Sequence, residues 1–119
     1  MHERIHIIRH KEKQILFVDC STCSAEVEKI ARLVPEIVTA QPLASVLALV
    51  DFTGAKFDEA TIRTMKESAV FDKPYIKASA WIGSEALPKI FYDQLARFSR
   101  RDFPAFKTRL DALEWLVKE

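Results

Sequence analysis

Apolar residues along this chain alternate between two spacings, and this alternation is the strongest constraint on its fold. Strand-like patterns, with a two-residue period or a short apolar run, occur at residues 5–8, 15–18, 46–50 and 76–82. A helical period near 3.6 occurs at residues 24–34, 58–70, 87–98 and from 108 onward, and residues 103–107 fit a short last strand. The sequence therefore predicts an α/β fold: a small, mainly parallel β-sheet with an antiparallel N-terminal hairpin, flanked by about four helices.

The same spacing predicts which side chains face the core. The run at residues 46–50 is apolar throughout, as in a strand buried on both faces. In the strand at 76–82, one face carries Ile76, Ala78, Ala80 and Ile82, and the other carries Lys77, Ser79 and Trp81. The inward residues expected on the helices are Val27, Ile30, Ala31 and Val34; Ile62, Met65 and Ala69; Leu87, Ile90, Phe91, Leu95 and Phe98; and Leu110, Leu113, Leu116 and Val117. Ser24 is expected to cap the first helix through its hydroxyl.

Length and charge exclude several classes of protein. The chain has 119 residues, which suits one domain covering residues 1–119. Its 18 Lys and Arg residues against 17 Asp and Glu give a net charge of +1, which offers no electrostatic case for a nucleic-acid partner. The apolar runs are far shorter than the ~20 residues that cross a bilayer, and residues 1–4 lack the apolar stretch of a signal peptide. We therefore expect a cytoplasmic protein with no transmembrane segment and no cofactor.

Cys20-Ser21-Thr22-Cys23 is a CxxC motif between a predicted strand and a predicted helix. A helix N-terminus stabilises a thiolate, so the motif allows a thiol–disulfide redox function for Cys20 and Cys23. In thioredoxin-like enzymes, however, the proline that faces the site leads into a β-hairpin, whereas Pro74 leads into a strand followed by a helix. Since Cys20 directly follows a strand, the preferred interpretation is two small, semi-buried residues. The sequence offers no second CxxC and no His-x-x-His pair, so we expect no metal site.

Two further sets of polar residues are candidates for binding. His2, His6 and His10 recur at every fourth position, which on a strand leaves their rings roughly 13 Å apart, too far for one metal ion. We expect them on a solvated edge. A local basic cluster, expected to be either a solvated surface or a site for an anionic ligand or acidic partner, consists of Arg97, Arg100, Arg101, Lys107 and Arg109. Lys77 lies in mid-strand, where it must reach solvent or an anion.

The only two glycines of the chain, Gly54 and Gly83, both follow predicted parallel strands. In open α/β sheets, ligands bind in the crevice at the carboxyl ends of such strands. A backbone without a side chain there permits a tight turn or a close approach. The simpler interpretation is that both glycines only end strands and have no role in binding. If the crevice is used, we expect it to be lined by Thr53, Gly54, Gly83 and Ser84, with Trp81 as an apolar wall.

Residues 50–57, Val50-Asp51-Phe52-Thr53-Gly54-Ala55-Lys56-Phe57, resemble the strand-end signature of STAS domains, the anti-sigma-factor-antagonist fold. Later segments look like the SpoIIAA-like branch of that family, which is also described as related to CRAL-TRIO lipid-transfer proteins. They are Lys73-Pro74-Tyr75-Ile76-Lys77-Ala78-Ser79-Ala80, Ser99-Arg100-Arg101, Phe106-Lys107-Thr108 and Ala112-Leu113-Glu114-Trp115-Leu116. The resemblance implies the STAS fold for most of the chain after Val46.

One departure limits what the resemblance implies about function. In phospho-switch STAS proteins, Asp-Ser-Ser-Gly follows the phenylalanine, and the second serine accepts a phosphate from a kinase. Here Phe57 is followed by Asp58-Glu59-Ala60-Thr61, which places Glu59 or Ala60 at the acceptor position and Thr61 one residue off register. The usual phosphoacceptor serine is therefore missing, and the resemblance supplies no catalytic residues.

These observations favour a non-enzymatic STAS-like module with a regulatory role, which binds a partner protein or a small apolar or anionic ligand. The alternative is a thiol–disulfide redox protein that uses Cys20 and Cys23. For assembly, we expect a weak homodimer that pairs through an apolar patch on the third long helix, formed by Phe91, Tyr92 and Phe98.

Overall fold

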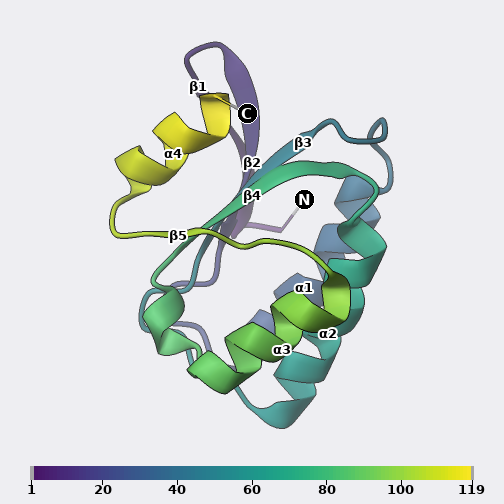
Figure 1. Cartoon of the computed structure of the whole chain (residues 1–119), viewed down its shortest axis with the longest axis vertical. Helices are drawn as coiled ribbons and strands as arrows, with labels where there is room; N and C mark the ends of the chain where they lie inside the picture. Colours follow the sequence, from purple (N-terminus) through teal and green to yellow (C-terminus); the bar gives the residue numbers. More distant parts are fainter. Residues whose placement is uncertain (1, 119) are drawn as a thin grey trace.

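A five-stranded mixed sheet forms the centre of the computed structural model, which describes residues 2–118 (Figure 1). The strands are β1 (Ile5–His10), β2 (Lys13–Asp19), β3 (Val46–Asp51), β4 (Ile76–Ile82) and β5 (Ala105–Phe106). They lie in the sheet in chain order; β1 pairs antiparallel with β2, and every later pair is parallel. The predicted α/β class, with an antiparallel N-terminal hairpin on a parallel sheet, is confirmed.

Four α-helices cover the sheet unequally. They are α1 (Ala25–Val38), α2 (Glu59–Asp72), α3 (Lys89–Ser99) and α4 (Arg109–Lys118), and a short 3-10 turn, η1 (Ser84–Ala86), precedes α3. Figure 1 shows α1, α2 and α3 together on one side of the sheet and α4 on the other. Among residues 2–118, no helix combines the length and the apolar composition needed to cross a membrane.

Each face of the sheet has its own core because alternate side chains of a strand point in opposite directions. Leu47 and Leu49 of β3, with Ala80 and Ile82 of β4, pack against α4. Trp81 faces the other side with Val18, where the core also takes in buried residues of α1, α2 and α3. The predicted burial of β3 on both faces is confirmed. The predicted division of β4 is confirmed for Ala78, Ala80 and Ile82 on one face and for Ser79 and Trp81 on the other, but it is wrong for Ile76, which packs on the Trp81 side. The register between β3 and β4 shifts at Val46 and Leu47, so the strict alternation is broken at this end of the strand.

Helix α1 continues through Pro35 to Val38, although the sequence pattern predicted an end at residue 34. A proline inside a helix cannot donate the hydrogen bond that the carbonyl four residues earlier would accept. Here that carbonyl belongs to Ala31, and the Ser68 hydroxyl of α2 donates to it at 2.5 Å. The side chain of another helix therefore replaces the missing donor. At the other end, Ser24 occupies the predicted cap position, but its hydroxyl makes no capping bond.

Three residues predicted to face the core lie instead at the surface: Ile90, Phe98 and Leu110 are 63%, 58% and 59% exposed. Helix α3 packs beside α2 rather than across the middle of the sheet, so a narrow stripe suffices to bury it. Leu95 lies in that stripe, and Leu87 is buried just before the helix begins. In α4, Ala112 replaces Leu110 in the contact with the sheet, together with the predicted Leu113 and Leu116.

Candidate functional site

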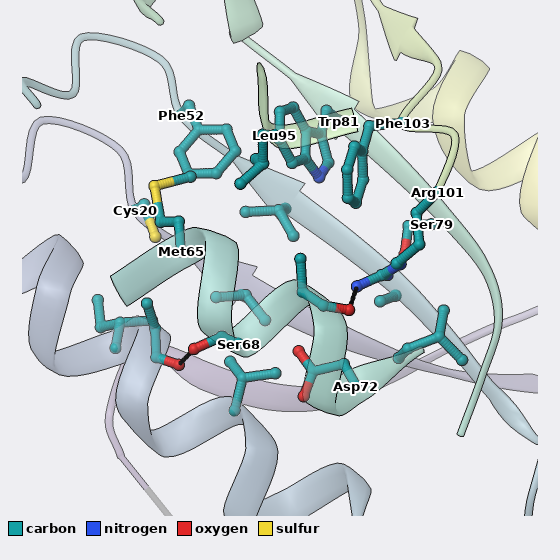
Figure 2. Close-up of a pocket in the computed structure, with 18 of the residues that line it drawn as sticks. Cys20, Phe52, Met65, Ser68, Asp72, Ser79, Trp81, Leu95, Arg101 and Phe103 are labelled. Atoms are coloured by element: carbon teal, nitrogen blue, oxygen red, sulfur yellow. Dashed lines mark hydrogen bonds between the residues drawn. The ribbon is translucent and has the colours of Figure 1, made fainter. Parts of the chain in front are cut away.

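A cavity of about 90 Å³ lies between the sheet and the three-helix layer (Figure 2). Strands β2, β3 and β4 form its floor, and α1, α2, α3 and the segment after α3 form its walls. Several lining positions carry small side chains, including Ala31, Ala48 and Ala69, so the helices span a space that their side chains do not fill. The cavity is therefore a consequence of alanine at facing positions of α1, β3 and α2.

The two ends of this cavity differ in chemistry. Figure 2 shows the sulfur atoms of Cys20 and Met65 near Phe52 at one end, and Asp72 and Arg101 at the other. Trp81 lies between, with its ring stacked on Phe103 at 4.4 Å between centroids. The apolar end can take hydrocarbon, and the polar end can take one hydrogen-bonding group.

Arg101 spans the polar end from the segment that follows α3. Its guanidinium donates to the Ala69 carbonyl of α2 at 3.0 Å and to the Ser79 hydroxyl of β4 at 2.8 Å. It also lies 4.8 Å from the ring centroid of Phe103, a cation–π contact. Burial lowers the pKa of Arg101, and the nearby Asp72 raises it again. Arg101 therefore ties α2 to β4 through a half-buried cation.

Asp72 ends α2 with its carboxyl group in the same place. The residue is only 6% exposed, and its Oδ1 atom is buried without a hydrogen-bond partner among residues 2–118. Burial raises the pKa of Asp72 from 3.8 to about 7, and the charge of Arg101 opposes this shift. A native protein pairs nearly all of its buried polar atoms, so an orphaned carboxyl oxygen that lines a cavity marks a place where a partner is missing.

Arg101 also separates this cavity from a larger open groove of about 690 Å³. The two spaces share Ile76, Ser79, Arg101 and Phe103 as walls. Strand β5 pairs only with Trp81 and Ile82, so the first half of β4 borders the groove instead of another strand. The groove brings solvent to the outer side of the Arg101 guanidinium.

The CxxC motif lies at the expected turn between β2 and α1, with both cysteines buried as free thiols. Burial raises the pKa of Cys20 to about 12, and Cys23 and Asp19 add to this effect. Burial also raises the pKa of Cys23. A nucleophilic thiol needs a lowered pKa and access to solvent. Here the pKa of both thiols is raised and both are buried, so nothing in this geometry supports the redox alternative.

The five residues predicted to bind a ligand fall in two places. Trp81 lines the cavity, whereas Thr53 and Gly54 lie in the loop after β3, and Gly83 and Ser84 lie at the start of η1 after β4. Both glycines have positive φ, and a Cβ at Gly83 would lie 2.4 Å from the backbone nitrogen of Thr53. Gly83 therefore permits a close approach of two loops, as the sequence suggested. Ligand binding by these four loop residues stays a prediction.

The predicted basic cluster is divided by the fold. Arg97, Arg100 and Lys107 are exposed, and Arg101 turns inward to the cavity. The Arg109 guanidinium lies 4.4 Å from the ring centroid of Phe17, on the α4 side of the sheet. These residues do not form one surface, because the chain crosses from one face of the sheet to the other between α3 and α4.

The histidines and the expected phosphoacceptor region have local roles. His6 is exposed and stacks on Phe17, whereas His10 is half-buried, with Nε2 3.0 Å from a Glu114 carboxylate oxygen. The expectation of a solvated edge is therefore wrong for His10, because α4 packs beside β1. At the start of α2, the Asp58 carboxylate accepts from the Thr61 backbone N–H at 2.7 Å. Thr61 itself is buried, so it presents no hydroxyl to a kinase.

The apolar patch predicted for pairing is smaller than expected. Phe91 and Tyr92 pack half-buried against the core, and the Tyr92 hydroxyl donates to the Phe103 carbonyl. Phe98 remains exposed, with Ile90 on the same helix. A weak homodimer stays a prediction.

Asp72 is the site residue that the sequence analysis missed, although a signal for it exists. Ile62, Met65, Ala69 and Asp72 follow one another at spacings of three and four residues, which places them on one face of a helix. The helix was predicted to end at residue 70, so Asp72 was not recognised as the next residue on this face. An acidic residue in the last turn of a helix is also unfavourable for the helix dipole, so its presence there called for an explanation.

No protein-family model matches this sequence, and no curated protein matches it. Among solved structures, the chain is similar to an uncharacterised protein of the DUF3478 family with a SpoIIAA-like fold, from Shewanella loihica PV-4. The two chains share 20% sequence identity, with a TM-score of 0.72 over 94% of this chain and 91% of the other. At that identity the likeness concerns the fold. The mixed sheet, its four helices and this likeness together show that the chain has a SpoIIAA-like fold, as the resemblance of residues 50–57 and of the later segments had implied.

Proposed function

We propose that this protein is a non-enzymatic STAS-like module that binds one small, mainly apolar ligand in the cavity beneath α1, α2 and α3. The observation that carries the proposal is the unpartnered Oδ1 atom of Asp72 in the wall of that cavity. A buried oxygen without a partner costs free energy, and a ligand that bonds to it removes that cost.

The size of the cavity limits the ligand. A cavity of ~150 Å³ holds benzene, and one water molecule needs ~10–15 Å³. The space of about 90 Å³ found here lies between these limits and suits an organic molecule of about four or five heavy atoms. The mostly aliphatic and aromatic lining favours a hydrocarbon part, and the polar end favours a single polar group.

The chemistry of the lining supports binding rather than catalysis. Apart from its polar end, the wall is made of aliphatic and aromatic groups. Cys20, the nucleophile nearest to the apolar end, is held in the thiol form because burial raises its pKa to about 12. A binding module of this kind responds to its ligand through stability, since occupancy stabilises the folded state in proportion to ligand concentration.

The experiment is a titration of ¹⁵N-labelled protein with propionate, 1-propanol and propylamine, followed by backbone amide shifts. These three probes share a three-carbon size and differ in the polar group. Binding in the cavity is expected to shift the amides of Ala69, Asp72 and Ser79 for at least one probe.

Two variants make the test specific. Ala69→Leu fills the cavity with a larger side chain and is expected to abolish the shifts. Ala60→Leu makes the same change at an exposed position of α2 and is expected to leave them unchanged. If no probe shifts these amides in the parent protein, or if Ala69→Leu binds as well as the parent, the proposal is wrong.

A further inference from the structure

We infer that the ligand of this cavity is a short-chain monocarboxylate of about three carbons, whose carboxylate lies between the carboxyl group of Asp72, the hydroxyl of Ser79 and the guanidinium of Arg101. The inference rests on the proposed function above and names the class of ligand for the same site.

The polar end has hydrogen-bond donors left for such a group. Arg101 uses N–H groups on the Ala69 carbonyl and the Ser79 hydroxyl, and a guanidinium carries further N–H groups in the same plane. The Ser79 oxygen accepts from Arg101, so its own hydrogen is free to donate. In Figure 2 the carboxyl group of Asp72 lies at the same end of the cavity as Arg101, without a direct contact between the two groups. A carboxylate placed here accepts from Arg101 and Ser79 and shares a proton with Asp72.

Charge decides between possible polar groups. Arg101 is the charged group that acts on Asp72. The residues that α1 and β4 contribute to the cavity wall are uncharged: Val27, Ile30, Ala31 and Val34 from α1, and Ile76, Ser79 and Trp81 from β4. With Asp72 protonated, Arg101 carries an uncompensated positive charge that a carboxylate neutralises. An ammonium group would instead place a second cation beside Arg101. Two carboxyl groups can lie side by side only if they share one proton, so binding takes up one proton from solvent when Asp72 is ionised.

The size of the site excludes larger anions. Five heavy atoms match propionate, and about 90 Å³ leaves no room for a long hydrocarbon chain. A dicarboxylate or a phosphate ester would bring a second charge into the apolar part of the cavity, which costs far more free energy than a single neutralised charge. The geometry therefore selects a monocarboxylate with a short aliphatic chain.

The test is the pH dependence of binding, because the affinity for propionate is expected to fall as pH rises, whereas the affinity for an alcohol or an amine is expected to rise. Burial raises the pKa of Asp72 to about 7, so above this pH the binding of a carboxylate requires the uptake of one proton from solvent. The dissociation constant of propionate is expected to rise about tenfold for each pH unit above 7.5, with one proton taken up per ligand. An alcohol or an amine donates to ionised Asp72, so its affinity would rise with pH. The amide titration is therefore repeated at pH 6.5, 7.5 and 8.5.

Variants separate the role of Asp72 from a general charge effect. Asp72→Asn keeps a hydrogen-bond donor and cannot ionise, so propionate affinity should become independent of pH and exceed that of the parent protein at pH 8.5. Asp102→Asn removes an exposed carboxylate next to Arg101 and should leave the parent profile unchanged. Neither variant deletes a hydrogen-bond partner of Arg101, so both are expected to fold.

The outcomes are distinguishable. Propionate binding that weakens with pH in the parent protein and not in Asp72→Asn supports the inference. Binding of 1-propanol or propylamine without propionate, or propionate binding that does not weaken with pH, overturns the inference and leaves the proposed function standing. Absence of binding by all three probes overturns both.

Discussion

The two faces of the sheet bury similar kinds of side chain but pack them differently. On one face, α4 fills the space above β3 and β4 with Ala112, Leu113 and Leu116, of which Ala112 and Leu116 have no exposed surface. On the other face, three helices enclose the cavity together with Asp72 and Arg101. The layer formed by α4 alone is therefore packed more closely against the sheet than the layer of three helices.

This difference shows where the fold carries its stability and where it carries its candidate site. A close-packed apolar face stabilises the native state and tolerates little change. A face with unfilled volume and a buried carboxyl group gives up some of that stability, as binding sites commonly do. If this division is real, equivalent substitutions on the two faces must have different effects.

The largest expected effect is on the α4 face. Leu116→Ala removes a fully buried side chain from close packing and is expected to lower the free energy of unfolding by roughly 2–5 kcal/mol. Urea unfolding followed by far-UV circular dichroism measures it. A loss below about 1 kcal/mol would mean that α4 adds little to the stability of the sheet.

The next effect concerns the cavity face and depends on pH. Since the pKa of Asp72 is about 7 in the folded protein and 3.8 in an ordinary chain, folding favours its protonated form. The contribution of Asp72 to stability is therefore complete below pH 3.8 and is lost as pH rises through 7. At ~1.4 kcal/mol per pKa unit, ionisation of Asp72 costs the folded state roughly 4 kcal/mol.

Asp72→Asn removes this cost and is expected to raise the free energy of unfolding at pH 8.5 by roughly 2 kcal/mol, less than the full amount because the amide still lacks a partner. At pH 4 the same variant should differ little from the parent protein. Urea unfolding at both pH values measures the difference, with Asp102→Asn as the exposed control. An equal effect at both pH values would contradict the assignment of the shift to Asp72.

A matched pair of alanine substitutions compares the packing of the two faces directly. Ala112→Leu forces a larger side chain into a filled space and is expected to cost roughly 1–3 kcal/mol. Ala69→Leu places the same side chain beside the cavity, where we expect a change below about 1 kcal/mol. The measurement is the midpoint of thermal unfolding for both variants. Equal destabilisation would show that the cavity cannot accept the added volume.

The smallest effect separates exposed from buried leucines on α4. Leu110→Ala removes a side chain that is 59% exposed, so the free energy of unfolding should change by less than about 0.5 kcal/mol. The comparison with Leu116→Ala in the same unfolding assay tests whether the face of α4 is assigned correctly. A loss above about 1.5 kcal/mol would place Leu110 in the core.

Much of the fold could be predicted from the sequence because local patterns determine it. The period of two in β4 gave its bounds correctly, and the continuous apolar run of β3 indicated burial on both faces. The end of α1 could not be predicted from its own residues. Pro35 indicates a stop, and the donor that permits continuation is Ser68 on another helix.

The candidate site was predicted less completely, for a similar reason. Trp81 was predicted as the wall of a crevice at the strand ends, and it lines this cavity instead, because its side chain points to the face of β4 that α1, α2 and α3 cover. Arg101 was grouped with surface arginines, since its neighbours in the sequence are exposed and only the packing of α2 against β4 shows that it turns inward. Asp72 could have been found by continuing the helical stripe of Ile62, Met65 and Ala69 by one more turn.

The order of the strands in the sheet has a consequence for synthesis on the ribosome. Because β1 to β5 lie side by side in chain order, each new strand adds to an edge that the preceding strand has just formed, and no strand is inserted between two earlier ones. The parallel pairs nevertheless join residues far apart in the sequence, such as Leu16 with Ala48, and pairings of this kind form slowly. Helix α4 follows all five strands in the chain, so Phe17, Leu47 and Leu49 remain uncovered until it has been made. We therefore expect the nascent chain to expose an apolar sheet face, of the kind that makes folding intermediates prone to aggregation, until α4 docks.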